Sequence, residues 1–246
     1  DQAHKVGSND SLIYPNAYHY RDWVINAIAS DLPYDRFIKL QLAADLIIPE
    51  DKEEHIALGF LGLGPKYYRR NTPEVMADEW EDRVDTVSRG LLGLTVACAR
   101  CHDHKYDPIP TTDYYALAGV FASTEMFNRP LNDTVEKQGK GQAKKPQDAY
   151  HLVRDGQPKD INVMIRGDVS KKGELVPRRF LTALSEEPLF FKNGSGRADL
   201  AEAITARSNP LTARVLVNRV WEQFLGQPLV GTPSNFGSLG EKPTHP

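Results

Sequence analysis

Apolar residues recur at every third or fourth position along much of this 246-residue chain, which is the spacing of one face of an α-helix. In the first third the pattern predicts two helices, one capped by Asn16 that closes near Asp31, and one that runs up to Pro49. Their apolar positions are Tyr20, Trp23, Val24, Ala27, Ile28, Phe37, Leu40, Ala44 and Ile47. The chain is therefore expected to open with a pair of packed helices.

The longest apolar stripe begins after Thr72, a predicted N-cap, and Pro73, which suits the first position of a helix. The members of this stripe are Met76, Trp80, Val84, Val87, Leu91 and Leu94. Charged residues fill the opposite face, and the stripe runs on toward the two cysteines of the chain. Gly90 and Gly93 each weaken a helix by about 1 kcal/mol relative to alanine, so the helix ends there or another group approaches closely.

A polar stretch without periodicity, residues 129–147, follows a short predicted helix that begins at Thr112 or Asp113. Because glycine, lysine and proline are frequent in this stretch, we predict a loop or linker that marks an internal boundary. The sequence thus divides into residues 1–128, the linker 129–147, and residues 148–246.

Beyond the linker, apolar and polar residues alternate over residues 161–166, which is a strand signal. Two more helices are predicted, one over residues 198–206 and one that starts after Asn209 and closes at Gly226. The predicted fold class is mainly α, with a small β element in the middle and a second helical segment at the C-terminus.

Composition and charge exclude two classes of protein. Hydrophobic residues make up 40% and charged residues 26%, which describes a globular chain, and no apolar run approaches the ~18 residues of a membrane-spanning helix. The formal net charge of −3 argues against a nucleic-acid binder, which normally carries a basic surplus on one face. We therefore expect no transmembrane segment in this piece and no nucleic acid as partner.

The chemistry of the chain is concentrated in one run, where the only two cysteines stand in Cys98-Ala-Arg-Cys101-His102. A Cys-x-x-Cys-His run is the attachment signature of c-type haem, with two thiols spaced to add to the porphyrin vinyl groups and a histidine beside them to bind the iron. The run predicts one covalent haem c held by Cys98 and Cys101, with His102 as the proximal iron ligand.

Three other uses of the same residues stay open. A thioredoxin-like redox pair needs a βαβ pattern around the cysteines, but the preceding sequence is helical. A zinc site could use Cys98 and Cys101 with His102 or His104, although structural zinc sites usually combine two separated ligand pairs. A disulfide across two intervening residues is strained.

Residues 93–109 read GLTVACARCHDHKYDPI and residues 113–117 read DYYAL, and together they closely resemble the planctomycete-type cytochrome c-like family. Flanking segments share the resemblance, namely residues 20–24, 32–37, 176–181, 209–214, 218–221 and 243–246. Members of this family are large exported bacterial proteins with two tandem domains of unassigned function. The resemblance implies a helical c-type cytochrome-like domain, with residues 1–128 as the C-terminal half of the first family domain and residues 148–246 as the start of the second.

Several residues are candidates for the second axial position on the iron. His245 lies in the family-like C-terminal motif and is the tentative distal ligand. In one continuous helix from residue 76 to residue 98, Met76 would lie about 33 Å from Cys98, which makes it a core residue. Met126 is expected to fill a gap in the core or lie at the surface, and His104 to anchor the turn or bind a haem propionate. An iron with five ligands, or with water as the sixth, stays open.

The expected function is one-electron transfer outside the cytoplasm, in the periplasm or another exported location, as part of a larger redox protein. The electron would pass to a redox partner protein or to other domains of the full-length chain. Two alternatives remain: a haem enzyme of peroxidase type with an open iron site, and a non-redox scaffold that binds zinc through the Cys-x-x-Cys-His run. Electron transfer is favoured over catalysis.

Overall fold

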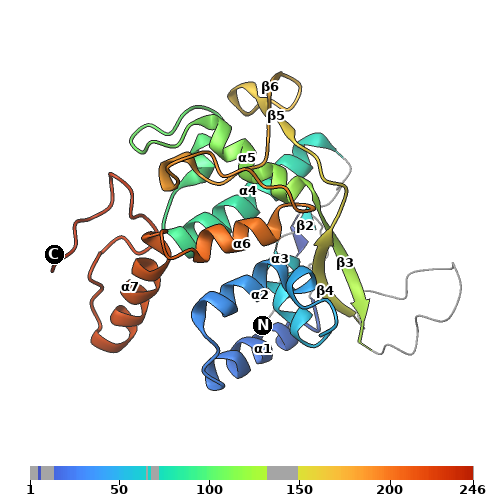
Figure 1. Cartoon of the computed structure of the whole chain (residues 1–246), viewed down its shortest axis with the longest axis vertical. Coiled ribbons are helices and arrows are strands. Elements are labelled where there is room, and N and C mark those ends of the chain that lie inside the picture. The colour runs from blue at the N-terminus through green and yellow to red at the C-terminus, as the bar shows by residue number, and fades with distance from the viewer. Residues whose placement is uncertain (1–4, 7–13, 65, 68–71, 132–148, 246) are drawn as a thin grey trace, which may run out of the picture.

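The computed structural model describes residues 5–6, 14–64, 66–67, 72–131 and 149–245, and within them the chain is mainly α, as predicted (Figure 1). The α-helices are α1 (Tyr18–Ala29), α2 (Tyr34–Ile47), α3 (Gly59–Gly62), α4 (Pro73–Val87), α5 (Thr111–Ala122), α6 (Arg197–Thr205) and α7 (Leu211–Leu225). Shorter helical turns are η1 (Glu54–Leu58), η2 (Ser88–Leu92), η3 (Val96–Arg100), η6 (Ile165–Gly167) and η7 (Thr182–Leu184). In this part of the chain, no helix is both long and apolar enough to span a bilayer.

Three small sheets, each of two strands, accompany the helices in the described residues. The strands are β1 (Lys5–Val6), β2 (Lys66–Tyr67), β3 (Thr124–Pro130), β4 (Ala149–Asp155), β5 (Ile161–Met164) and β6 (Lys172–Val176). The first pair, β1 with β2, is parallel, whereas β3 with β4 and β5 with β6 are antiparallel. The alternation over residues 161–166 thus correctly predicted β5, and the longer β3–β4 pair was not predicted.

Local signals placed several helix ends correctly. The helix α4 begins at Pro73 directly after Thr72, and α7 ends where Gly226 takes a left-handed backbone with φ of 78°. Asn209 accepts a hydrogen bond from the backbone N–H of Leu211 at 3.1 Å, as its predicted capping role requires.

Asn16 does not cap α1 as predicted. Its side-chain amide instead donates to the carbonyl of Ala149 at 3.3 Å, so it joins the start of α1 to β4. The helix α1 begins one residue after Ala17 and is followed by Asp31 in a left-handed conformation with φ of 57°.

The hydrophobic core lies between α2, α4, α5 and α6, and it also takes side chains from β4 (Figure 1). Leu58 and Leu117 from the first half share it with Leu152 and Leu200 from the second. The predicted linker, residues 129–147, lies mostly outside the described residues, but its first two residues, Arg129 and Pro130, are the end of β3 and pair with β4. The core is therefore built by chain from both sides of the linker.

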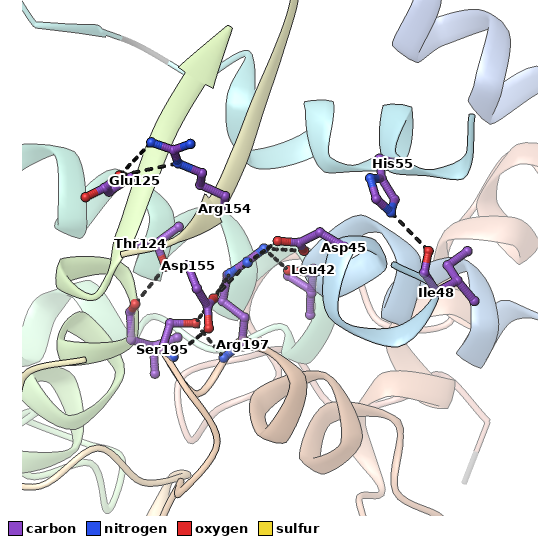
Figure 2. Close-up of polar contacts among 11 residues, drawn as sticks. Leu42, Asp45, Ile48, His55, Thr124, Glu125, Arg154, Asp155, Ser195 and Arg197 are labelled. Carbon is purple, nitrogen blue, oxygen red and sulfur yellow. Dashed lines mark hydrogen bonds and ion pairs between the residues drawn. The ribbon is translucent and has the colours of Figure 1, made fainter. Parts of the chain in front are cut away.

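A buried arginine joins three of the elements that enclose the core (Figure 2). Arg197, at the start of α6, is 1% exposed and donates to the carboxylates of Asp45 on α2 and Asp155 on β4, with closest distances of 2.8 Å to each. It also donates to the carbonyl of Leu42 at 3.1 Å. Ser195 donates to the carboxylate of Asp155 through both its backbone N–H and its hydroxyl.

This network shifts the acidity of Asp155. Burial alone would raise the pKa of its carboxyl, but the hydrogen bonds from Ser195 and the charge of Arg197 outweigh burial and hold the pKa below its usual 3.8. The carboxylate therefore stays charged opposite the guanidinium at neutral pH.

Candidate functional site

The Cys-x-x-Cys-His run lies on a surface turn between α4 and α5. The turn η3 presents Val96 and Ala99 to the core, where both are fully buried. Cys98 and Cys101 are free thiols on the exposed side, and His102 is exposed beside them. The two sulfurs are not joined, which disagrees with the disulfide alternative.

Gly93 ends the long helical segment before the run. The helix α4 stops at Val87 and continues as the wider turn η2, after which Gly93 takes a left-handed conformation with φ of 63°. The prediction that the helix ends at these glycines or that another group approaches there is confirmed, because a Cβ atom at Gly93 would lie 2.8 Å from the ring of Phe236. The distance of about 33 Å between Met76 and Cys98 held only for one continuous helix and does not apply. Met76 nevertheless packs against the hydrophobic core.

Arg100 bonds the turn η3 to the side of α4. Its guanidinium donates to Asp78 at 2.8 Å and also to Glu81, so η3 lies beside α4 and does not extend it. Burial alone would lower the pKa of Arg100, but these two carboxylates raise it above its ordinary value. Arg100 therefore stays charged and holds the turn that carries the cysteines against α4.

His102 has one ring nitrogen engaged by its own loop. Its Nδ1 lies 2.7 Å from the carbonyl oxygen of Asp103, and since a carbonyl can only accept, Nδ1 carries the hydrogen and donates. The neutral ring then has its lone pair on Nε2. The Asp103 carboxylate accepts from the backbone N–H of Thr111 at 2.7 Å, a hydrogen bond that lowers the pKa of Asp103 and ties the loop to α5.

His104 holds the loop together and offers no free nitrogen. Its Nδ1 accepts from the backbone N–H of Asp107 at 2.9 Å, so its Nε2 carries the hydrogen and donates to the hydroxyl of Thr95 at 3.0 Å. The contact with Thr95 joins the residues on either side of the Cys-x-x-Cys-His run. The prediction that His104 anchors the turn is confirmed by these two bonds.

Tyr115 on α5 contacts the backbone of the Cys-x-x-Cys-His run, a role that was not predicted from the sequence. Its hydroxyl lies 3.0 Å from the carbonyl oxygen of Arg100 and 3.2 Å from that of Met164, and its one hydrogen is shared between these two acceptors. Burial raises the pKa of Tyr115 to about 12, so the hydroxyl keeps its hydrogen at neutral pH. The residue thus connects α5, the cysteine turn and the end of β5.

The C-terminal part of the chain braces the same loop. The backbone N–H of Phe236 donates to the carbonyl of Gly93 at 2.7 Å, and that of Ser238 donates to the carboxylate of Asp107 at 2.6 Å. Arg219 on α7 donates to the carbonyl of Gly90 at 2.6 Å.

His245 is exposed, and its Nδ1 lies 3.0 Å from the hydroxyl of Thr244. Among the described residues, no hydrogen bond, ion pair or ring contact joins His245 to His102. Its distal role therefore stays a prediction.

The two methionines weighed as iron ligands share one cavity. Met76 and Met126 line a space of about 360 Å³ together with Glu125, Gln157 and Lys159. Both methionines also pack against the hydrophobic core, in agreement with the gap-filling interpretation.

Within the described ranges, no three His, Cys, Asp or Glu side chains are grouped as a metal site would require. The zinc alternative would therefore have to draw its ligands together, and if it used His104 in place of His102, that ring would first have to break its bonds to Thr95 and Asp107.

The fold and the site define a mainly helical protein that carries a Cys-x-x-Cys-His run on a braced surface turn. Residues 2–126, just over half of the chain, match the family model PSCyt2, described as a protein of unknown function (DUF1549), and the chain belongs to this family. Residues 196–246 match a second model, PSD1, also described as a protein of unknown function (DUF1553). Residues 148–195 of the predicted second part lie outside both matches. Searches of curated proteins and of solved structures found no match.

Proposed function

We propose that this chain binds one haem c covalently and transfers single electrons. Cys98 and Cys101 would hold the haem through thioethers, and His102 would bind its iron through Nε2. The observation that carries this proposal is the donor set itself: two free, exposed thiols and an adjacent exposed imidazole whose Nδ1 is already bonded to Asp103.

The surrounding residues would keep this donor set in place. The carbonyl of Asp103 fixes the tautomer and the orientation of the His102 ring, which is the usual arrangement behind a metal-binding histidine. Arg100 and His104 hold the two ends of the turn against α4 and Asp107. When bound, the haem supplies an iron that gains or loses one electron, with a potential tuned by its axial ligands.

The family resemblance of residues 93–109 supports the finer proposal that the chain is a planctomycete-type cytochrome c-like protein. On this proposal it works outside the cytoplasm, in the periplasm or another exported location, within a larger redox protein. Its electron partner would be a separate redox protein or another domain of the same chain. Electron transfer needs no substrate pocket beside the iron, so the exposed position of the run is suited to it.

The test is to export residues 1–246 in a bacterium that has a c-type haem attachment system, and to measure the intact mass and the pyridine haemochrome spectrum. We expect a mass increase of one haem that survives denaturation, and no increase in a variant that combines Cys98→Ser with Cys101→Ser. A bare polypeptide with both thiols open to alkylation, or with stoichiometric zinc, would overturn the proposal.

Carbon monoxide distinguishes the carrier from the enzyme. An unchanged spectrum of the reduced protein supports an electron carrier with both axial positions filled. A shifted spectrum would instead favour the peroxidase-type alternative with an open iron site.

A further inference from the structure

A sharp turn of the chain lies directly against one of the two thiols. Gly167, in the turn η6 between β5 and β6, has a left-handed backbone with φ of 76°. A Cβ atom added at this glycine would lie 2.7 Å from the sulfur of Cys101, closer than real Cβ atoms approach another atom. Arg166 beside it is also left-handed, with φ of 56°.

Several hydrogen bonds hold the turn in this position. The hydroxyl of Tyr115 connects the carbonyl of Arg100, next to the thiol, with that of Met164, next to the turn. Within the turn, the backbone N–H of Ile165 donates to the carbonyl of Lys171 at 2.9 Å. Moving this turn away from Cys101 would therefore break the contact of the Tyr115 hydroxyl with Arg100 or with Met164.

We infer that Gly167 is a positioning residue for the thioether at Cys101, an inference that rests on the proposed function. In this step the thiol S–H adds across a vinyl C=C bond. A C–S bond forms, the S–H bond and the π bond break, and the hydrogen goes to the terminal vinyl carbon. No oxidant or reductant is consumed. The step requires the sulfur of Cys101 to stay where it can reach the vinyl carbon. Because Gly167 has no side chain, the sulfur has room to keep that position.

The unattached and attached proteins respond differently to a methyl group at position 167. A free thiol can rotate about the Cα–Cβ bond of Cys101 and move away from the methyl group. A sulfur that is also bonded to the haem has lost this freedom, because its position is fixed at both ends. The methyl group should therefore act on attachment at Cys101 and leave attachment at Cys98 intact.

The experiment compares the exported wild type with Gly167→Ala and counts the thiols that can be alkylated after denaturation. We expect none in the wild-type holoprotein and one, at Cys101, in the variant, because the added methyl group would lie 2.7 Å from the sulfur that the haem holds in place. The haemochrome band should shift to longer wavelength, because one vinyl group stays unsaturated. Gly173→Ala in the same hairpin is the matched control: its nearest neighbour would lie at an ordinary 3.4 Å, and we expect no free thiol.

The outcomes separate the two proposals. A wild type without covalent haem overturns both. A Gly167→Ala protein with both thioethers and an unshifted band overturns this inference and leaves the proposed function standing. If circular dichroism shows that Gly167→Ala does not fold, Tyr115→Phe decides, since it removes the hydroxyl that ties the turn to Arg100 and keeps the ring. A partial free thiol at Cys101 in Tyr115→Phe supports the inference, and its absence overturns it.

Discussion

Replacing Arg197 with methionine should destabilise the folded chain more than any other single change in its polar network. Methionine keeps much of the length of the side chain and removes its charge, together with the five hydrogen bonds that the guanidinium donates to Leu42, Asp45 and Asp155. Arg197 is 1% exposed, and the side chains of Asp45 and Asp155 are only 18% and 22% exposed, so water replaces the lost partners only in part. Two carboxylates then face each other without a cation.

Removing one partner from a buried ion pair costs about 3–5 kcal/mol, which is a large share of the stability of a typical domain. For a chain of this size, that cost lowers the midpoint of thermal unfolding by roughly 6–20 °C. The free energy of unfolding is measured by urea denaturation, followed by circular dichroism, in both wild type and variant.

Arg154→Met is the matched control, since Arg154 forms a surface pair with Glu125 in the same region of the molecule (Figure 2). Both side chains are more than half exposed, at 57% and 55%, so the control should lose less than about 1 kcal/mol. If Arg197→Met costs no more than Arg154→Met, the network does not hold α2, β4 and α6 together and the reasoning fails.

Three further predictions concern stability, and all use the same urea measurement. The stabilisation from Asp155 is fully present above its unfolded pKa of about 3.8 and is lost as the pH falls through its lower folded value. The free energy of unfolding of wild type should therefore fall more steeply below about pH 4 than that of Asp155→Asn, and equal slopes would contradict this. Gly93→Ala should cost at least about 1–2 kcal/mol for its left-handed backbone, since its Cβ would also lie 2.8 Å from the ring of Phe236, whereas Gly90→Ala, with open space around it, should be neutral or stabilising. His104→Leu should cost about 1–3 kcal/mol because it leaves the backbone N–H of Asp107 without its acceptor, and a change within error would show that this bond does not hold the loop.

The sequence was most informative where structure depends on neighbours in the chain. Pro73 and Gly226 mark helix ends through their own backbone preferences, and both predictions are confirmed. The identity of the donor set could also be proposed from the chain alone, because Cys98, Cys101 and His102 are almost contiguous.

Prediction failed where distant segments decide the conformation. The glycines correctly predicted that the helix ends near Gly93 or that another group approaches there, but the approaching residue, Phe236, comes from the far end of the sequence and could not be predicted from it. Tyr115 contacts the backbone next to Cys101, and Gly167 lies against its sulfur. Both contacts join distant parts of the sequence, so no local pattern predicts them. The β3–β4 pair likewise brings together two distant strands, and β3 includes Arg129 and Pro130, which the sequence assigned to the linker.

Hydrogen bonds from Arg219, Phe236 and Ser238 connect the second family segment to the turn that carries the cysteines in the first. A fragment limited to residues 2–126 would keep the two thiols and the imidazole but would strip hydrogen-bond donors from the carbonyls of Gly90 and Gly93 and from the carboxylate of Asp107. The geometry of this region therefore depends on both the PSCyt2 and the PSD1 segments, and truncating either one would change the environment of the two thiols.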